Sequence, residues 1–295
     1  LLSMGTLQDL PRTSQPATSS TIGVLDQIDL VEWYFEQGWT DGLPVVPPTP
    51  ETVAAMVAAL GGDPNHLEAR VPPRWGNLTR EVLAINMVLA GCTPAYAPVV
   101  RAAMLALCSS HFNLNGIQAT THMAAPLLVV NGPVRAAIGM NAGANVFGSG
   151  NRANATIGRA IRLVLLNVGG AWPGDLDKST LGHPGKYSFC IAENEELSPW
   201  QPYHMDMGFQ RDESAVTVVT VTGPTTVIDS TSRSHEDTLN NIASMMFYKN
   251  AGAGGWIRGW QSAQVGHTNK RVPYQGPYHP IILSPSRAVI MAEAG

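Results

Sequence analysis

A cysteine between two predicted helices is one of the few side chains in this chain of 295 residues that could act as a nucleophile. Cys92 lies in Ala90-Gly-Cys-Thr-Pro94, at the expected start of a helix. The dipole of a helix stabilises a thiolate at its N-terminus and so lowers the pKa of the thiol. Cys92 is therefore a candidate nucleophile or metal ligand, with a small buried packing residue as the alternative.

His122 is a candidate for proton transfer. It follows Gln118-Ala-Thr-Thr and stands just before an apolar run. An imidazole among hydroxyl groups can act as an acid or base, or bind a metal. A histidine held in a structural role by threonine hydroxyls is the alternative.

An acidic segment supplies the third candidate, Glu193, in Glu193-Asn-Glu-Glu196. His204 and Asp206 follow shortly after it. Carboxylates beside a histidine suit acid–base catalysis or a hard metal ion. A solvated acidic turn is the alternative. If a metal ion is the cofactor, Cys92, His122 and His204 are its candidate ligands, although no metal spacing such as H-E-x-x-H is present.

A Gly- and Asn-rich segment, 139–154, is the candidate substrate-binding loop and leads into a predicted helix. Its glycines let the backbone approach a ligand, and the arginines add fixed positive charge. It matches neither a Walker A loop nor the dinucleotide fingerprint. A structural glycine loop is the alternative to a binding loop. The residues expected to orient a small anionic substrate are Asn151, Arg152, Asn154 and Arg159.

Three apolar runs of β type end in a turn that carries proline, at 127–133, 215–224 and 281–285, and each leads into a segment predicted to be helical. Proline suits the first turn of a helix. A long apolar helix is expected before each run, and this alternation predicts an α/β fold with a layered sheet. The segments 126–138 and 280–290 resemble each other. The strand–(Gly/Ser)-Pro–helix unit is thus either an internal repeat or a chance similarity.

Apolar spacing and capping signals predict the elements that position these residues. A loosely attached arm is expected over 1–22 and one α/β domain over 23–295, with a sub-boundary near 172–186. The helices are expected at 25–37, 50–60, 79–89, 95–107, 155–168 and 235–248, with a strand-like stretch at 116–121.

Composition narrows the class of protein. Charged residues make up only 14% of the chain, which favours an oligomer, either homo- or hetero-oligomeric. The formal net charge of −4 and the lack of a Lys/Arg run argue against nucleic acid. No apolar run approaches the roughly 20 residues that cross a bilayer. Three cysteines without a C-x-x-C pair suit a reducing cytoplasm.

The motif Trp39-Thr-Asp-Gly-Leu-Pro-Val-Val-Pro-Pro-Thr49, together with Met87-Val-Leu-Ala-Gly-Cys92, resembles a family of uncharacterised bacterial proteins. The resemblance extends over about 36–209 and again near the C-terminal strand. Its Thr-Asp-Gly-Leu-Pro part is also similar to a motif of the UGSC group, which are suspected thiol or selenol oxidoreductases. The Cys-Gly-Ser-Cys of that group is absent here. The resemblance implies an enzyme-like bacterial family without naming a reaction.

The sequence therefore predicts an enzyme that acts on a small, anionic organic substrate through a Cys/His-based site, nucleophilic or metal-assisted. Its reaction class stays open between lyase or hydrolase chemistry and thiol- or metal-dependent oxidoreduction. The alternative is a non-catalytic or partner-dependent subunit of a hetero-oligomeric enzyme complex, such as an oxidoreductase. The low charge and an aromatic-rich segment at 256–278 favour that alternative.

Overall fold

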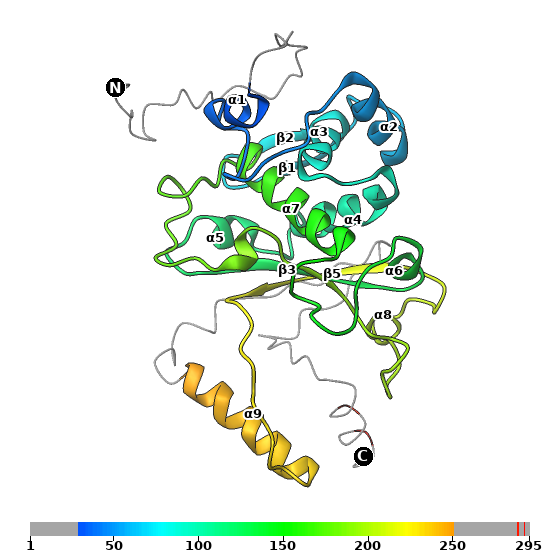
Figure 1. Ribbon diagram of the computed structural model, residues 1–295, viewed down its shortest axis with the longest axis vertical. Coiled ribbons are helices and arrows are strands. Elements are labelled where there is room, and N and C mark those ends of the chain that lie inside the picture. The colour runs from blue at the N-terminus through cyan, green and yellow to red at the C-terminus, as the bar shows by residue number, and fades with distance from the viewer. Residues whose placement is uncertain (1–28, 251–287, 289–291, 293–295) are drawn as a thin grey trace.

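Helices pack against a three-stranded mixed sheet in the computed structural model, which describes residues 29–250, 288 and 292 (Figure 1). The sheet has the order β4-β3-β5. The central strand β3 (Ala125–Asn131) runs parallel to β4 (Cys190–Ala192) and antiparallel to β5 (Ala215–Val221). This mixed sheet with its helices confirms the predicted α/β class.

Helices and short turns account for most of the remaining elements. A two-stranded antiparallel ribbon pairs β1 (Leu67–Val71) with β2 (Gly76–Thr79). The α-helices are α1 (Leu30–Glu36), α2 (Pro50–Leu60), α3 (Arg80–Ala90), α4 (Ala97–Leu107), α5 (Leu114–Gln118), α6 (Val134–Ala137), α7 (Arg152–Asn167), α8 (Tyr203–Asp206) and α9 (His235–Asn250). The 3-10 turns are η1 (Pro94–Tyr96) and η2 (Pro184–Lys186).

Local signals set the ends of the main helices. Thr49 and Thr52 form a reciprocal capping box at the start of α2, and Gly61 ends this helix in a left-handed conformation. Thr79 caps α3. Asn151 caps α7 by accepting the Asn154 N–H. The helices predicted at 50–60 and 79–89 are thus confirmed to within one residue.

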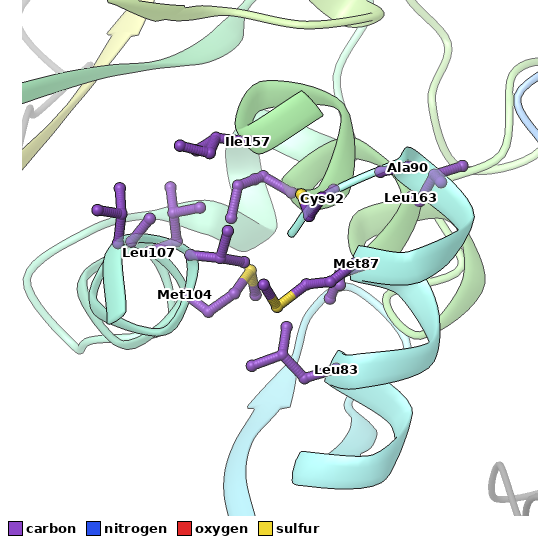
Figure 2. Close-up of a cluster of buried hydrophobic side chains, with 14 of the residues drawn as sticks. Leu83, Met87, Ala90, Cys92, Met104, Leu107, Ile157 and Leu163 are labelled. Carbon is purple, nitrogen blue, oxygen red and sulfur yellow. The ribbon is translucent and has the colours of Figure 1, made fainter. Parts of the chain in front are cut away.

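The helix α7 is the centre of the helical layer. It contacts α3, α4 and β4, and Figure 1 shows α4 beside it on the same face of the sheet, with α2 and α3 farther from the sheet. Its buried side chains join those of α3 and α4 in one apolar core (Figure 2). Several of these side chains have relative exposures of zero or one per cent, and they include Leu83, Met87, Met104, Leu107, Ile157 and Leu163.

The sequence prediction was wrong at 116–121, where the structure has α5 instead of a strand. The Asn113 side chain accepts the Gly116 N–H, and Leu114 and Ile117 are both buried. A cap followed by apolar residues three positions apart is a helical pattern. The short segment lacks the alternation that a half-buried strand requires.

The strand–proline–helix units differ from one another in the structure. After β3, the helix α6 has only four residues and Gly139 follows it with a positive φ of 66°. After β5, residues 222–234 contain no regular element before α9 begins. The third unit, 281–285, lies outside the described residues. The structure thus does not show internal repetition.

Different helices lie at the two ends of the sheet. Figure 1 shows α5 at the end where β3 begins, and α6 and α8 near the end where β3 finishes. Buried polar side chains gather at each of these ends.

In the part of the chain that the structure describes, no helix has the length and apolar character to cross a membrane.

Candidate functional site

A cluster of polar side chains lies where the parallel strands β3 and β4 end. Asn131 is the last residue of β3, and Glu193 directly follows β4. The Asn131 amide nitrogen donates to Glu193 and, at 3.0 Å, to Glu195. The carboxyl ends of parallel strands are the place where ligands bind in α/β proteins. The structure therefore brings the predicted residue Glu193 to the favourable edge of the sheet.

Gly132 allows the backbone to approach this cluster closely. Its N–H donates to Oε1 of Glu195 at 2.7 Å. Its φ is 84°, and a Cβ atom there would lie 2.2 Å from the carbonyl oxygen of Glu213. Only glycine fits both the conformation and the space.

Arg135 is the buried cation of the cluster. Its guanidinium contacts Oε2 of Glu195 at 2.8 Å and Oε1 of Glu196 at 2.9 Å, and donates to the Glu193 carbonyl oxygen at 2.8 Å. Burial lowers the pKa of Arg135, but Glu196 and Glu195 outweigh this effect and leave the pKa raised. Three carboxyl groups against one guanidinium give the ionised cluster an excess of negative charge.

His204 is the residue of the cluster whose ring has no hydrogen-bond partner among the described residues. It is 1% exposed, and within the described residues neither ring nitrogen has a hydrogen-bond partner. Its Nδ1 lies 3.9 Å from Oε1 of Glu195. Buried polar groups are almost always paired, so this imidazole is the unusual member of the cluster. The Asn131 Oδ1 atom is also buried without such a partner in the described part.

The short helix α8 carries His204 to this position. The backbone N–H of Tyr203 donates to Oε2 of Glu193 at 3.0 Å, which fixes the start of α8 against the carboxylate. Asp206, at the end of α8, is exposed and accepts from the Gln201 side chain instead. Of the two later residues that the sequence associated with Glu193, His204 joins the cluster and Asp206 faces away from it.

Cys92 lies in the apolar core, as Figure 2 shows. The residue is 8% exposed, and its thiol donates to the Thr156 carbonyl oxygen at 3.3 Å. Burial raises the pKa of Cys92 to about 12, and the Thr156 contact and Arg152 offset only part of that effect. The lowered pKa expected at a helix start is therefore wrong. The physical reason is desolvation of the thiol in the core, which is the largest cause of the raised pKa.

His122 lies on the surface, next to the segment 178–180. Its N–H donates to the Thr120 hydroxyl at 3.0 Å, and its carbonyl accepts from Ser179 at 3.0 Å. Cys92, His122 and His204 thus have different neighbours. Across residues 29–250, 288 and 292, no group of three or more His, Cys, Asp or Glu side chains could hold a metal ion.

Two of the four loop residues expected to bind substrate hold the loop itself. Asn151 caps α7 and also donates to the Gly139 carbonyl at 3.2 Å. Asn154 is buried. Its Oδ1 accepts the Asn141 N–H and its Nδ2 donates to the Asn141 carbonyl oxygen, both at 2.9 Å. These contacts close the loop 141–151 onto the start of α7.

The two arginines of this region bind neighbouring segments of the chain. Arg152 donates to the Gly91 carbonyl at 2.9 Å. Arg159 makes a two-pronged ion pair with Asp41, at 2.9 and 2.8 Å, and also donates to the Leu43 carbonyl. The segments 39–49 and 87–92 are therefore both held by α7.

Sequence reasoning missed Asn131, Gly132 and Arg135. Their signal was present, because Asn-Gly-Pro directly follows a fully apolar run, and residues at the carboxyl end of a buried strand are candidates for a site.

Comparison of the chain with family models, with curated proteins and with solved structures found no match.

Proposed function

We propose that this chain is an enzyme that performs general acid–base catalysis on a small polar organic molecule at the carboxyl ends of β3 and β4. One observation carries the proposal. The buried His204 imidazole has no hydrogen-bond partner within the described residues and lies 3.9 Å from Glu195. A substrate that hydrogen-bonds His204 would satisfy its ring nitrogens.

Each residue of the cluster has a role in this proposal. Glu193, which is partly exposed, transfers a proton to or from the substrate, and His204 binds or polarises the reacting group. Asn131 and Arg135 are positioning residues, since they hold the carboxylates of Glu193 and Glu195 through the contacts described above.

The charge of the cluster bears on the class of substrate. Two carboxylates contact the one guanidinium and a third lies beside them, so the ionised cluster repels an anion and attracts a cation. Arg152 and Arg159, the residues expected to bind an anion, are engaged with Gly91 and Asp41. The proposed substrate is therefore neutral or cationic rather than anionic.

A site with Cys92 as its nucleophile has less support than the site at His204. A thiol with a pKa of about 12 is almost entirely protonated at neutral pH, and the thiolate is the nucleophilic form. The proposal keeps a histidine at the centre of the site, but it is His204 rather than His122.

Turnover of small molecules by the full chain tests this function. Pools of polar organic compounds are incubated with the protein in deuterated water, and NMR follows both product formation and deuterium uptake by the substrate. We expect His204→Asn to remove any activity found and Cys92→Ser to keep it. Activity that survives His204→Asn but is lost in Cys92→Ser would replace this proposal with the cysteine-based site.

A partner-dependent subunit is the second candidate function, and exposed apolar side chains around α1 favour it. Trp33 packs edge-on against Tyr34 and Trp39, with ring centroids 5.1 and 5.5 Å apart. The exposed apolar residues of this area, each 40–48% accessible, are Val31, Phe35, Trp39, Leu43 and Val46. An aromatic-rich apolar area of this kind is typical of an interface.

A further inference from the structure

Trp75 extends the exposed apolar area around α1. It is 59% exposed and lies in the turn between β1 and β2. Its φ of 59° is in the left-handed region, which bulky residues seldom adopt, and strained backbone of this kind gathers at binding sites. The Arg74 N–H holds the turn by donating to the Gly169 carbonyl oxygen at 3.0 Å. The turn thus presents Trp75 to solvent from a fixed position.

Trp39 and Trp75 lie at the same end of α7. The Trp39 carbonyl oxygen accepts from the Asn167 side chain at 3.2 Å, and Asn167 comes shortly before Gly169 in the chain. The rings of Trp33 and Trp39, with centroids 5.5 Å apart, join this end to α1. Figure 1 shows α1 and the ribbon of β1 and β2 at the same end of the molecule. The exposed apolar residues at this end form what we call the aromatic surface: Val31, Phe35, Trp39, Leu43, Val46 and Trp75.

The aromatic surface is large for a chain that stays alone in water. Phe35, Trp39 and Trp75 are 44%, 40% and 59% exposed. A whole aromatic side chain has about 150–250 Å² of surface, so these three leave roughly 300 Å² in water, and the aliphatic members add to it. A monomer rarely exposes a continuous apolar patch larger than a few hundred Å². The size therefore favours a protein interface.

The α1 side of the aromatic surface is acidic. Glu32 and Glu36 are exposed and lie one turn apart, next in sequence to Val31 and Phe35. The Asp29 carboxylate caps the same helix. No Lys, Arg or His occurs between residues 29 and 42. This side therefore carries an excess of negative charge.

The ribbon side carries the opposite charge. The arginines of the ribbon and of its ion pairs are Arg70, Arg74, Arg80 and Arg101. Two carboxylates balance them in the described ion pairs: Glu68, which Arg80 and Arg101 share, and Asp175, which pairs with Arg74. Arg70, on β1, is exposed. The ribbon side therefore has an excess of positive charge.

We propose that the aromatic surface is the interface of a homodimer, in which α1 of each protomer packs against the ribbon of the other. The charges argue for a second copy as the occupant, because the surface carries both signs. A two-fold axis between α1 and the ribbon brings each sign opposite the other. The aromatic side chains then form the centre of the interface and the charged ones its rim. This dimer does not depend on the proposed catalytic cluster, and it occupies the surface that a different partner chain needs.

Sedimentation equilibrium of the full-length chain measures this assembly. We expect a dimer that dissociates on dilution. Trp75→Ser should raise the dissociation constant about tenfold or more, as the loss of a central aromatic anchor does. The matched control is Leu181→Ser, because Leu181 is 82% exposed but lies outside the aromatic surface. This control should leave the dissociation constant unchanged.

Charge reversal tests how the two copies are arranged. Glu36→Arg and Arg70→Glu should each weaken the dimer, because like charges then meet across the interface. An equimolar mixture of the two variants should associate again, since each variant offers the charge that the other lacks. Recovery on mixing requires that the contact joins two chains.

Four outcomes would overturn the proposal. The first is a single-chain mass for the unaltered protein at every concentration, and the second is a dimer that Trp75→Ser leaves intact. The third is a pair of charge variants that associate as tightly as the unaltered chain, or that do not recover on mixing. The fourth is a different chain bound to the aromatic surface in protein purified from its own host. If circular dichroism shows that Trp75→Ser does not fold, the charge variants decide.

Discussion

Burial controls the reactivity of single residues in this protein, and the Cys92 thiol is the clearest case. The thiol lies in the core, and its pKa of about 12 keeps it protonated at neutral pH. Burial also raises the pKa of Cys108 to about 12 and raises that of Cys190. The three cysteines of the chain should therefore resist alkylation while the protein is folded.

Mass spectrometry after iodoacetamide treatment at about pH 8 checks this prediction. We expect the folded protein to gain no alkyl group over a time in which the unfolded chain gains three, one for each cysteine. Rapid modification of Cys92 alone in the folded protein would show that its thiolate is accessible and that the core position is wrong.

The same pKa shift makes stability depend on pH. The folded state prefers the neutral Cys92 thiol, since its pKa is raised from 9.0 to about 12. The stabilisation is complete below pH 9, where both states hold the proton. It is lost as the pH rises from about 9 to about 12, because only the unfolded state then ionises. Urea unfolding should show a smaller loss over this range in Cys92→Ala than in the unaltered chain.

Single residues were only partly predictable from the sequence. Glu193 and His204 were proposed because a carboxylate run preceded a histidine, and the structure places them in one cluster. Asn131 and Arg135 were missed although they follow an apolar run, because their contacts with the acidic segment depend on β4 lying beside β3, which local sequence does not state. Arg152 and Arg159 were expected to face a ligand. Their partners in the structure, Gly91 and Asp41, lie 61 and 118 residues away in the chain, so local sequence did not indicate these contacts.

At the scale of elements, α7 holds the N-terminal segment through one ion pair. The side chains of Arg159 and Asp41 are 16% and 4% exposed, and the contact is two-pronged. Removing one partner of a buried pair leaves an uncompensated charge. We predict that Asp41→Asn lowers the free energy of unfolding by about 3 kcal/mol.

Urea unfolding measures this loss, and Arg74→Gln is the matched control. Arg74 pairs with Asp175, but the two side chains are 41% and 31% exposed. Exposed pairs contribute about 0–1 kcal/mol, so the control should change stability little. Equal losses in both variants would mean that the Arg159–Asp41 pair is no better shielded from water than a surface pair.

A glycine in α7 allows the segment before β4 to pack closely on this helix. A Cβ atom at Gly158 would lie 2.3 Å from the Ser188 hydroxyl and 2.7 Å from the Phe189 nitrogen. Alanine normally favours a helix over glycine by about 1 kcal/mol. Here we expect Gly158→Ala to destabilise the protein by about 1–3 kcal/mol, because the segment before β4 must move.

The thermal midpoint of Gly158→Ala checks this packing, with Gly143→Ala as the control. A Cβ atom at Gly143 would meet its nearest neighbour at 3.7 Å, an ordinary contact. The control should therefore stay close to the unaltered chain. A Gly158→Ala protein that is more stable than the unaltered chain would contradict the close contact.

Elements were predicted well where a local signal exists and poorly where tertiary contacts decide. Apolar spacing located α2 and α3 to within one residue, whereas α7 begins three residues before the predicted start at 155, because Asn151 caps it. The five-residue helix α5 was read as a strand, because a segment so short carries little periodicity. The helical segment predicted after β3 is present as α6, and Gly139, with its positive φ, follows it after four residues.

At the scale of the whole molecule, native mass spectrometry separates the two candidate functions. An enzyme with a complete site should carry its activity without a second kind of chain. A partner-dependent subunit purified from its own host should come with an obligatory partner bound near α1, where the exposed apolar side chains lie. Replacing Trp39 and Phe35 by serine should then release the partner. An active protein without any second chain would exclude the subunit function.

The fold class followed from the alternation of helices and strands, but the polar clusters at the two ends of the sheet did not. Each cluster joins residues from segments far apart in the chain, such as Asn131 with Glu193 and Arg162 with Gln118. Periodicity describes which face of an element is buried. It does not state which elements become neighbours.

The central claim is that Glu193 and His204 form a proton-transfer site, and one rate comparison tests it most directly. The rate of deuterium uptake or turnover is measured for the unaltered chain, Glu193→Gln and Asp206→Asn with the same substrate. Asp206 is exposed and its side chain bonds Gln201, so it is the matched control. We predict that Glu193→Gln lowers the rate by about 10²–10⁴ and that Asp206→Asn leaves it unchanged. Equal rates in Glu193→Gln and the unaltered chain would contradict the proposed site.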